Sequence, residues 1–169
     1  MTPSTEQPLY VGVCGAGTPM IHDEEAWAEE VGRLLAREGA VVVCGGMTGV
    51  MDAVARGVAQ EGGVSIGILP GLDRDGASPH VTYTIPSGMG EARNTVLVRS
   101  ADAVVAIAGE FGTLSEIALA LKIGIPVVGL KTWELHKSGE AVDAFELAET
   151  PDEAVRKAMA AARRHRARD

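Results

Sequence analysis

The sequence predicts an α/β fold in which a doubly wound parallel sheet carries helices on both faces. Two observations predict it: apolar runs rich in Val, Ile and Ala alternate with helical patterns, and most of these runs end in glycine-rich turns. Continuous apolar strands are buried on both faces, and strand–helix alternation with short turns produces right-handed crossovers. We therefore expect a single Rossmann-like domain over residues 1–169, with residues 1–8 flexible.

The apolar runs and the capping signals define the elements in order. We predict strands at residues 10–14, 40–44, 65–69, 81–85, 103–108 and 126–130, with a short seventh at 144–147. The first helix begins after Asp23, a suitable N-cap, and stops at Gly39. Further helices are predicted at 49–61, 91–100 and 112–123. Pro151 suits the first turn of a last helix that runs into the basic C-terminal tail.

The net charge argues against two classes of partner. A formal net charge of −8 argues against binding to a nucleic acid polymer or to a membrane surface. A small anion is still compatible with it, because local N–H groups and one arginine can outweigh a diffuse negative field. No apolar run is long enough to span a membrane, and no signal peptide is evident.

The cysteines and histidines show no metal-ligand or redox pattern. Cys14 and Cys44 lack C-x-x-C spacing and are interpreted as buried thiols in a reducing compartment. The four histidines have no ligand spacing either. We expect a cytoplasmic protein with no metal site and no resident cofactor.

The glycine-rich strand ends identify the expected binding edge. In a doubly wound sheet, ligands bind beyond the carboxyl ends of the strands, where these turns gather. Candidate ligand-binding residues are Gly15, Ala16, Gly17, Gly45, Gly46, Met47, Thr48, Gly49, Asn94, Gly109, Glu110, Phe111, Gly112 and Thr113. The first two turns could equally serve only the path of the chain. NAD is disfavoured, because Met20 stands where the dinucleotide fingerprint needs glycine and no acidic residue ends the second strand.

The stretch 109–116, Gly-Glu-Phe-Gly-Thr-Leu-Ser-Glu, is the most informative motif. A strand that feeds a helix through a glycine turn aims backbone N–H groups and the positive end of the helix dipole at an anion. Glu116 follows about one helical turn later, in otherwise apolar surroundings, where a carboxylate is costly unless it is paired, solvated or functional. Arg93 opens another helix, where the dipole gives a cation no benefit, so a ligand or a carboxylate partner is expected there.

The helix over 112–123 is apolar nearly all round, so the sheet can cover one side of it and something else must cover the opposite side. We expect a homo-oligomer whose interface includes the helices around Val96 and Leu119.

The ordered motifs resemble those of the lysine-decarboxylase-like LOG ("lonely guy") proteins. Their P-G-G-x-G-T-x-x-E signature corresponds to residues 108–116, and their G-G-x-x-x-G-L-M block to residues 44–51. Ala108 replaces the proline, Glu110 replaces the second glycine, and Asn94 follows Arg93 in place of lysine. These departures resemble a sister branch related to the molybdenum-cofactor carriers.

The resemblance implies a function and two catalytic residues. Established LOG members cleave cytokinin nucleoside 5′-monophosphates into the base and ribose 5-phosphate. Arg93 and Glu116 match the family's catalytic pair, so N-glycosidic hydrolysis of a nucleoside 5′-monophosphate is expected if the protein is an enzyme. The alternative is a non-catalytic carrier whose phosphate site holds a phosphorylated cofactor such as molybdenum cofactor.

Overall fold

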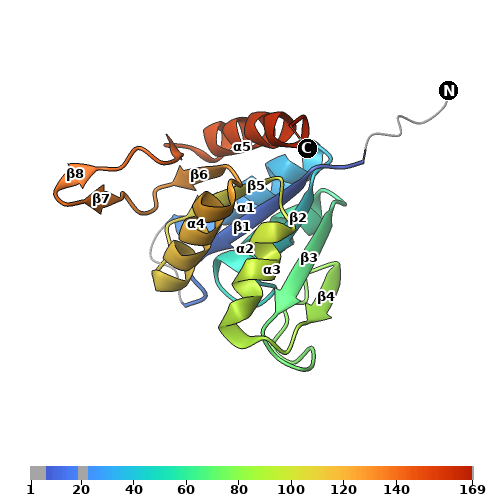
Figure 1. The fold of residues 1–169 in the computed structure, drawn as a ribbon. Helices are drawn as coiled ribbons and strands as arrows, with labels where there is room; N and C mark the ends of the chain where they lie inside the picture. The colour runs from blue at the N-terminus through green and yellow to red at the C-terminus, as the bar shows by residue number, and fades with distance from the viewer. Residues whose placement is uncertain (1–6, 19–22, 169) are drawn as a thin grey trace.

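The computed structural model describes residues 7–18 and 23–168 (Figure 1). A seven-stranded sheet, parallel at every pairing, has the order β4-β3-β2-β1-β5-β6-β9. Its strands are β1 (Tyr10–Gly15), β2 (Val41–Cys44), β3 (Val64–Leu69), β4 (Tyr83–Pro86), β5 (Ala103–Ile107), β6 (Val127–Leu130) and β9 (Glu146–Ala148). The helices are α1 (Glu24–Arg37), α2 (Val50–Gln60), α3 (Arg93–Arg99), α4 (Phe111–Ile123) and α5 (Pro151–Arg166).

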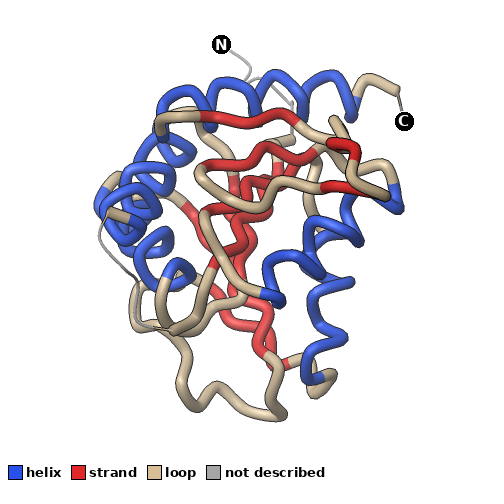
Figure 2. The backbone as a smooth tube through the Cα atoms, turned by 90° about the vertical axis from the view of Figure 1, so that its left-hand side faces the viewer, coloured by secondary structure: helices blue, strands red, loops and turns tan. Residues whose placement is uncertain are grey.

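The predicted doubly wound fold is confirmed, because helices cover both faces of the sheet (Figure 2). Side chains alternate across each strand, so Val42 and Cys44 enter the core under α1, α2 and α5, whereas Val43 enters the core under α3 and α4. Both faces are therefore dry, as a sheet of continuous apolar strands requires.

Hydrogen bonds hold the segment before β1 at the edge of the sheet where the strands begin. Asp102, directly before β5, accepts a hydrogen bond of 2.7 Å from the Tyr10 N–H and also pairs with Arg166. Arg166 donates to the carbonyls of Gln7 and Pro8 at 2.8 and 2.9 Å. Of the segment 1–8 predicted to be flexible, residues 1–6 lie outside the described residues, and residues 7–8 are held by these contacts.

Three elements begin two residues later than the sequence predicts. Strand β4 begins at Tyr83 instead of residue 81, because Thr82 exchanges hydrogen bonds with Ser65 and continues the preceding loop. The helix expected from residue 91 begins as a 3-10 turn, η1 (Gly90–Ala92), before α3. The short strand expected at 144–147 runs instead from residue 146 to 148, where it pairs with β6.

A small antiparallel hairpin, β7 (His136–Lys137) and β8 (Glu140–Ala141), was not predicted. Its two turn residues, Ser138 and Gly139, both have positive φ, as a tight two-residue hairpin turn requires. The strands are exposed and only two residues long, so no periodic pattern could indicate them. In Figure 1 the hairpin projects from the body of the protein.

The last helix starts as the sequence predicts. Thr150 caps it by accepting a hydrogen bond of 3.2 Å from the Glu153 N–H, and Pro151 occupies the first turn. Glu153 in turn accepts from the Glu149 N–H at 2.9 Å. No helix of the described residues combines the length and the apolar character needed to cross a bilayer.

Candidate functional site

A cavity of about 230 Å³ lies at the carboxyl ends of β1 and β2, beside the starts of α3 and α4. It brings together residues from all four elements. Of the predicted site residues, its lining contains Gly15, Gly17, Gly45, Arg93, Asn94, Gly112, Thr113 and Glu116. The remaining lining residues are Val13, Cys14 and Met51.

The start of α4 presents unpaired donors to this cavity. The first helical hydrogen bond runs from the Leu114 N–H to the Glu110 carbonyl at 3.0 Å, so the N–H groups of Phe111, Gly112 and Thr113 precede the helical ladder. No side chain caps this end. The Thr113 hydroxyl is buried and has no hydrogen-bond partner among the described residues. Together these donors form a site suited to an anion.

The Glu116 side chain is 7% exposed and lines the same cavity. Burial raises the pKa of its carboxyl group to about 7, although the positive charge of Arg93 and a hydrogen bond with the Cys14 thiol lower it. Buried charge is expensive, so this carboxyl group can exist in either protonation state near neutral pH. A group with that property is suited to proton transfer or to transient charge stabilisation.

Arg93 reaches back from the start of α3 to the ends of two strands. Its Nη1 donates to the Gly45 carbonyl at 2.8 Å and to the Ile68 carbonyl at 2.6 Å. The absence of a side chain at Gly45 makes room for the guanidinium, since a Cβ there would lie 2.3 Å from Nη1. Both backbone contacts use Nη1, so the Nε and Nη2 donors of the guanidinium are available to a ligand.

The other predicted residues of the first two turns lie beside the cavity and shape it. Gly49 has φ +68°, and a Cβ there would lie 2.2 Å from the Ala16 carbonyl oxygen. The Thr48 hydroxyl donates to the Gly17 carbonyl at 2.6 Å and so fastens one turn to the other. Outside the cavity lining are Ala16, Gly46, Met47, Thr48, Gly49, Gly109 and Glu110.

The turn before α4 has an unusual backbone. Ala108 has φ +43° and Gly109 φ +93°, and a Cβ on Gly109 would collide with the Thr113 side chain. The Ala108 N–H donates to the Leu130 carbonyl at 3.0 Å, and its own carbonyl accepts from the Thr132 hydroxyl. Proline, which the LOG signature has at this position, fixes φ near −65° and has no N–H, so it is incompatible with this turn.

Cys14 belongs to the site, although the sequence indicated only a buried thiol. Burial and the adjacent Glu116 carboxylate raise the pKa of the thiol well above its usual value, so it stays protonated and donates toward Glu116. Its position directly before the Gly15 turn was the available signal. Cys44 is likewise buried, as predicted.

A second, larger cavity of about 710 Å³ adjoins the first. The two share Arg93, Asn94 and Gly112. Phe111, a predicted site residue, lines the larger cavity together with Ser115.

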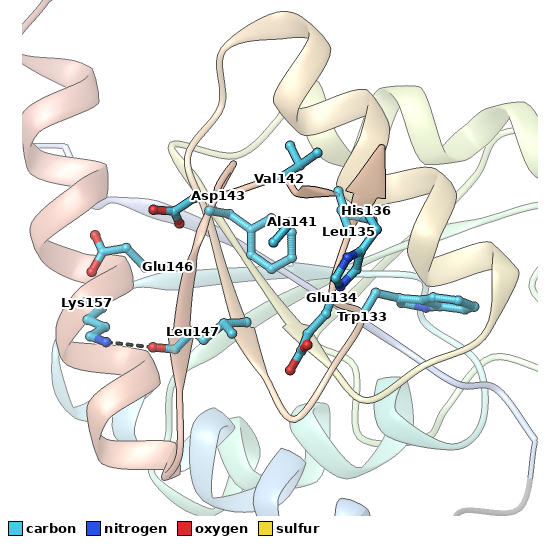
Figure 3. Close-up of a pocket in the computed structure, with 11 residues that line it drawn as sticks. Trp133, Glu134, Leu135, His136, Ala141, Val142, Asp143, Glu146, Leu147 and Lys157 are labelled. Atoms are coloured by element: carbon cyan, nitrogen blue, oxygen red, sulfur yellow. Dashed lines mark hydrogen bonds between the residues drawn. The ribbon is translucent and has the colours of Figure 1, made fainter. Parts of the chain in front are cut away.

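A third cavity, of about 420 Å³, lies between the segment 133–147 and α5 (Figure 3). Its lining is largely apolar and contains none of the predicted site residues. At one end of it, the Lys157 ammonium donates to the Leu147 carbonyl at 2.6 Å. Across the described part of the chain, no three His, Cys, Asp or Glu side chains gather in a way that could hold a metal ion.

Known proteins share this sequence and fold. The chain is 40% identical over 149 residues to an uncharacterized protein of Archaeoglobus fulgidus. The match covers 87% of this chain and 92% of that protein. It is 32% identical over 107 residues to a probable cytokinin riboside 5′-monophosphate phosphoribohydrolase of Oryza sativa subsp. japonica; the match spans 62% of this chain and about half of that protein, 47%.

Among solved structures, the molybdenum cofactor binding protein of Rippkaea orientalis superposes with a TM-score of 0.82 at 31% identity, covering 91% of this chain and 97% of that one. The sequence model of the SLOG cluster4 family matches residues 8–159. The resemblance to the LOG and molybdenum-cofactor-carrier superfamily is therefore confirmed, and the chain belongs to the SLOG cluster4 family.

Proposed function

We propose that the protein binds a phosphate-bearing nucleotide at the carboxyl edge of the sheet and hydrolyses the N-glycosidic bond of a nucleoside 5′-monophosphate. One observation carries the proposal: a single cavity contains helix N-terminal donors, a Thr113 hydroxyl that has no partner among the described residues, and both Arg93 and Glu116.

The phosphate would bind at the start of α4. The Gly112 and Thr113 N–H groups and the Thr113 hydroxyl would donate to its oxygens, and the helix dipole favours a negative charge there. This arrangement gives the buried hydroxyl the partner that the described residues do not supply.

The glycosidic step would use Glu116 and Arg93. A water oxygen would bond to C1′ of the ribose while the bond from C1′ to the base nitrogen breaks and its electron pair leaves with the base. The proton that the water gives up to Glu116 would pass to the base nitrogen, which restores the carboxylate. The Glu116 carboxylate would orient the water, accept its proton and offset positive charge on the ribose. Arg93, fixed through Nη1 to two strand ends, would stabilise the departing base with its remaining donors.

A carrier of a phosphorylated cofactor is the second candidate. The match to the molybdenum cofactor binding protein extends over more of both chains than the match to the plant hydrolase. The same donors at α4 would then hold the cofactor phosphate, and Glu116 would be a binding or structural residue.

Incubation with AMP separates the two candidates. Hydrolysis predicts adenine and ribose 5-phosphate in equal amounts by liquid chromatography, formed ~10²-fold or more slowly by the Glu116→Gln variant. If the parent protein releases no base from any nucleoside monophosphate yet binds a phosphorylated pterin, the carrier function replaces the hydrolase. Mass spectrometry of small molecules that co-purify with the protein identifies the ligand directly.

We also propose a homo-oligomer in which α3 and α4 meet a second copy. Both helices cover one core and still leave apolar side chains uncovered: Val96 is 36% exposed and Leu119 is only partly buried. Light scattering should give a multiple of 17.5 kDa at micromolar concentration, and Val96→Glu should reduce it. A parent mass near 17.5 kDa would rule the oligomer out.

A further inference from the structure

Phe111 is a large aromatic side chain that protein atoms cover poorly. It is the first residue of α4 and is 79% exposed, although it directly precedes the donors of the anion site. An exposed aromatic ring beside a candidate ligand site is placed to contact a bound ligand.

Trp133 holds the Phe111 ring in place. The two ring centroids are 5.6 Å apart with an interplanar angle of 36°. The Trp133 indole N–H donates to the Glu110 carbonyl at 3.3 Å, which ties the segment after β6 to the turn before α4. In Figure 3 the indole lies at the end of the third cavity farthest from Lys157. One side of Phe111 is thus supported, while most of its surface remains open.

The open side of Phe111 lines the larger cavity, which continues from the anion site. The two cavities border each other at Arg93, Asn94 and Gly112, which line both. A hydrogen-bonded chain fixes this border: Asn94 Nδ2 donates to Ser115 Oγ at 3.2 Å, and Ser115 Oγ donates to the Gly112 carbonyl at 2.7 Å. A ligand with its phosphate at α4 can therefore extend past Arg93 to the aromatic ring.

We propose that the larger cavity is the subsite for a planar nitrogen heterocycle of the ligand, which stacks on Phe111, with Trp133 as a supporting residue. This inference rests on the proposed phosphate site. Stacking suits any planar base, because every such ring has a π-face. The ligand class is thus a phosphate ester that carries a nucleobase or a pterin, and a sugar phosphate alone would fill only the smaller cavity.

Calorimetric titration with AMP and with ribose 5-phosphate tests the subsite. Loss of one base–aromatic contact weakens binding by about tenfold or more. We expect Phe111→Leu to weaken AMP binding by that factor, to leave ribose 5-phosphate affinity within about twofold, and Phe111→Trp to restore AMP binding. Tyr83→Leu, at an exposed aromatic residue of β4 that lines neither cavity, is the matched control and should change nothing. A pterin monophosphate in place of AMP distinguishes the two sources of the heterocycle.

Three results would overturn the inference alone, and a fourth would overturn the proposed function as well. Equal loss for both ligands in Phe111→Leu would mean that the variant disturbs the start of α4 rather than ring recognition. Equal affinity of the parent for AMP and ribose 5-phosphate would leave the phosphate site standing without a ring subsite. A lower mass for Phe111→Leu in light scattering would make the ring an interface between copies. If the parent binds neither phosphate ester, the proposed function fails first, and the subsite with it.

Discussion

The guanidinium of Arg93 lies against the backbone of Gly45, whose carbonyl accepts a hydrogen bond of 2.8 Å from Nη1. The contact joins the second glycine turn to α3 and leaves no room for a side chain on the glycine. A glycine that reads as a turn residue in the sequence therefore positions a candidate catalytic group.

Gly45→Ala should displace Arg93 without altering the turn. The new Cβ would lie 2.3 Å from both Arg93 Nη1 and Met51 Sδ, so both side chains must shift, whereas no left-handed backbone angle is required at Gly45. We expect AMP binding to weaken by about tenfold, the scale of one charge-assisted hydrogen bond. Calorimetry measures this, with Gly71→Ala as the control because its Cβ would meet nothing closer than 3.9 Å. Unchanged affinity would show that Arg93 does not contact the ligand.

The Glu116 carboxyl group should make stability depend on pH. Its pKa is raised to about 7 in the folded protein, so the folded state keeps a proton that the unfolded chain has already lost above about pH 4.5. The stabilising contribution of the protonated form is complete below pH 4.5 and is lost as the pH rises through about 7. At pH 8 the buried charge costs the parent about 3 kcal/mol relative to low pH.

Thermal unfolding of Glu116→Gln checks this pH dependence. The variant should gain several degrees in Tm relative to the parent at pH 8 and lose that advantage at pH 4.5. Glu140→Gln, at an exposed residue of β8, should show no such trend. A constant difference between parent and Glu116→Gln from pH 4.5 to pH 8 would contradict the raised pKa.

Hydrolysis of AMP should depend on both Arg93 and Glu116. Glu116→Gln keeps the shape of the side chain but removes the charge that supports an electron-poor ribose carbon, and we expect a loss of ~10²-fold or more in kcat. Arg93→Ala should lower kcat and weaken binding together. AMP binding should survive Glu116→Gln, because the phosphate donors belong to other residues. Parent rates in both variants would refute the assigned roles.

The turn before α4 should reject the proline of the LOG signature. Ala108→Pro cannot adopt φ +43° and removes the hydrogen bond from the residue 108 N–H to the Leu130 carbonyl. We expect a loss of at least ~2 kcal/mol in the free energy of unfolding, measured in urea. Ala108→Gly tolerates the angle and should stay within about 1 kcal/mol of the parent. A stable Ala108→Pro variant would mean that this turn can adopt the family's other backbone.

The sequence alone determined the fold class and the edge of the sheet that carries the site. Runs such as 103–108 are apolar at every position, so both their faces must be covered, and a parallel sheet with helices on each side is the consequence. Local chemistry also identified the glycine turn before α4 and the start of α5 at Pro151.

Tertiary structure decided which of the glycine-turn residues line the cavity and which neighbours join them. Met47 and Thr48 lie beside it, whereas Cys14 faces Glu116, because these positions depend on how β1, β2 and α4 are brought together across long stretches of chain. The same holds for Trp133, which contacts the turn before α4 because β6 pairs with β5 and places the segment after β6 beside that turn. Periodicity and capping act over a few residues, but burial, and with it the pKa of Glu116, is set by contacts that no local pattern records.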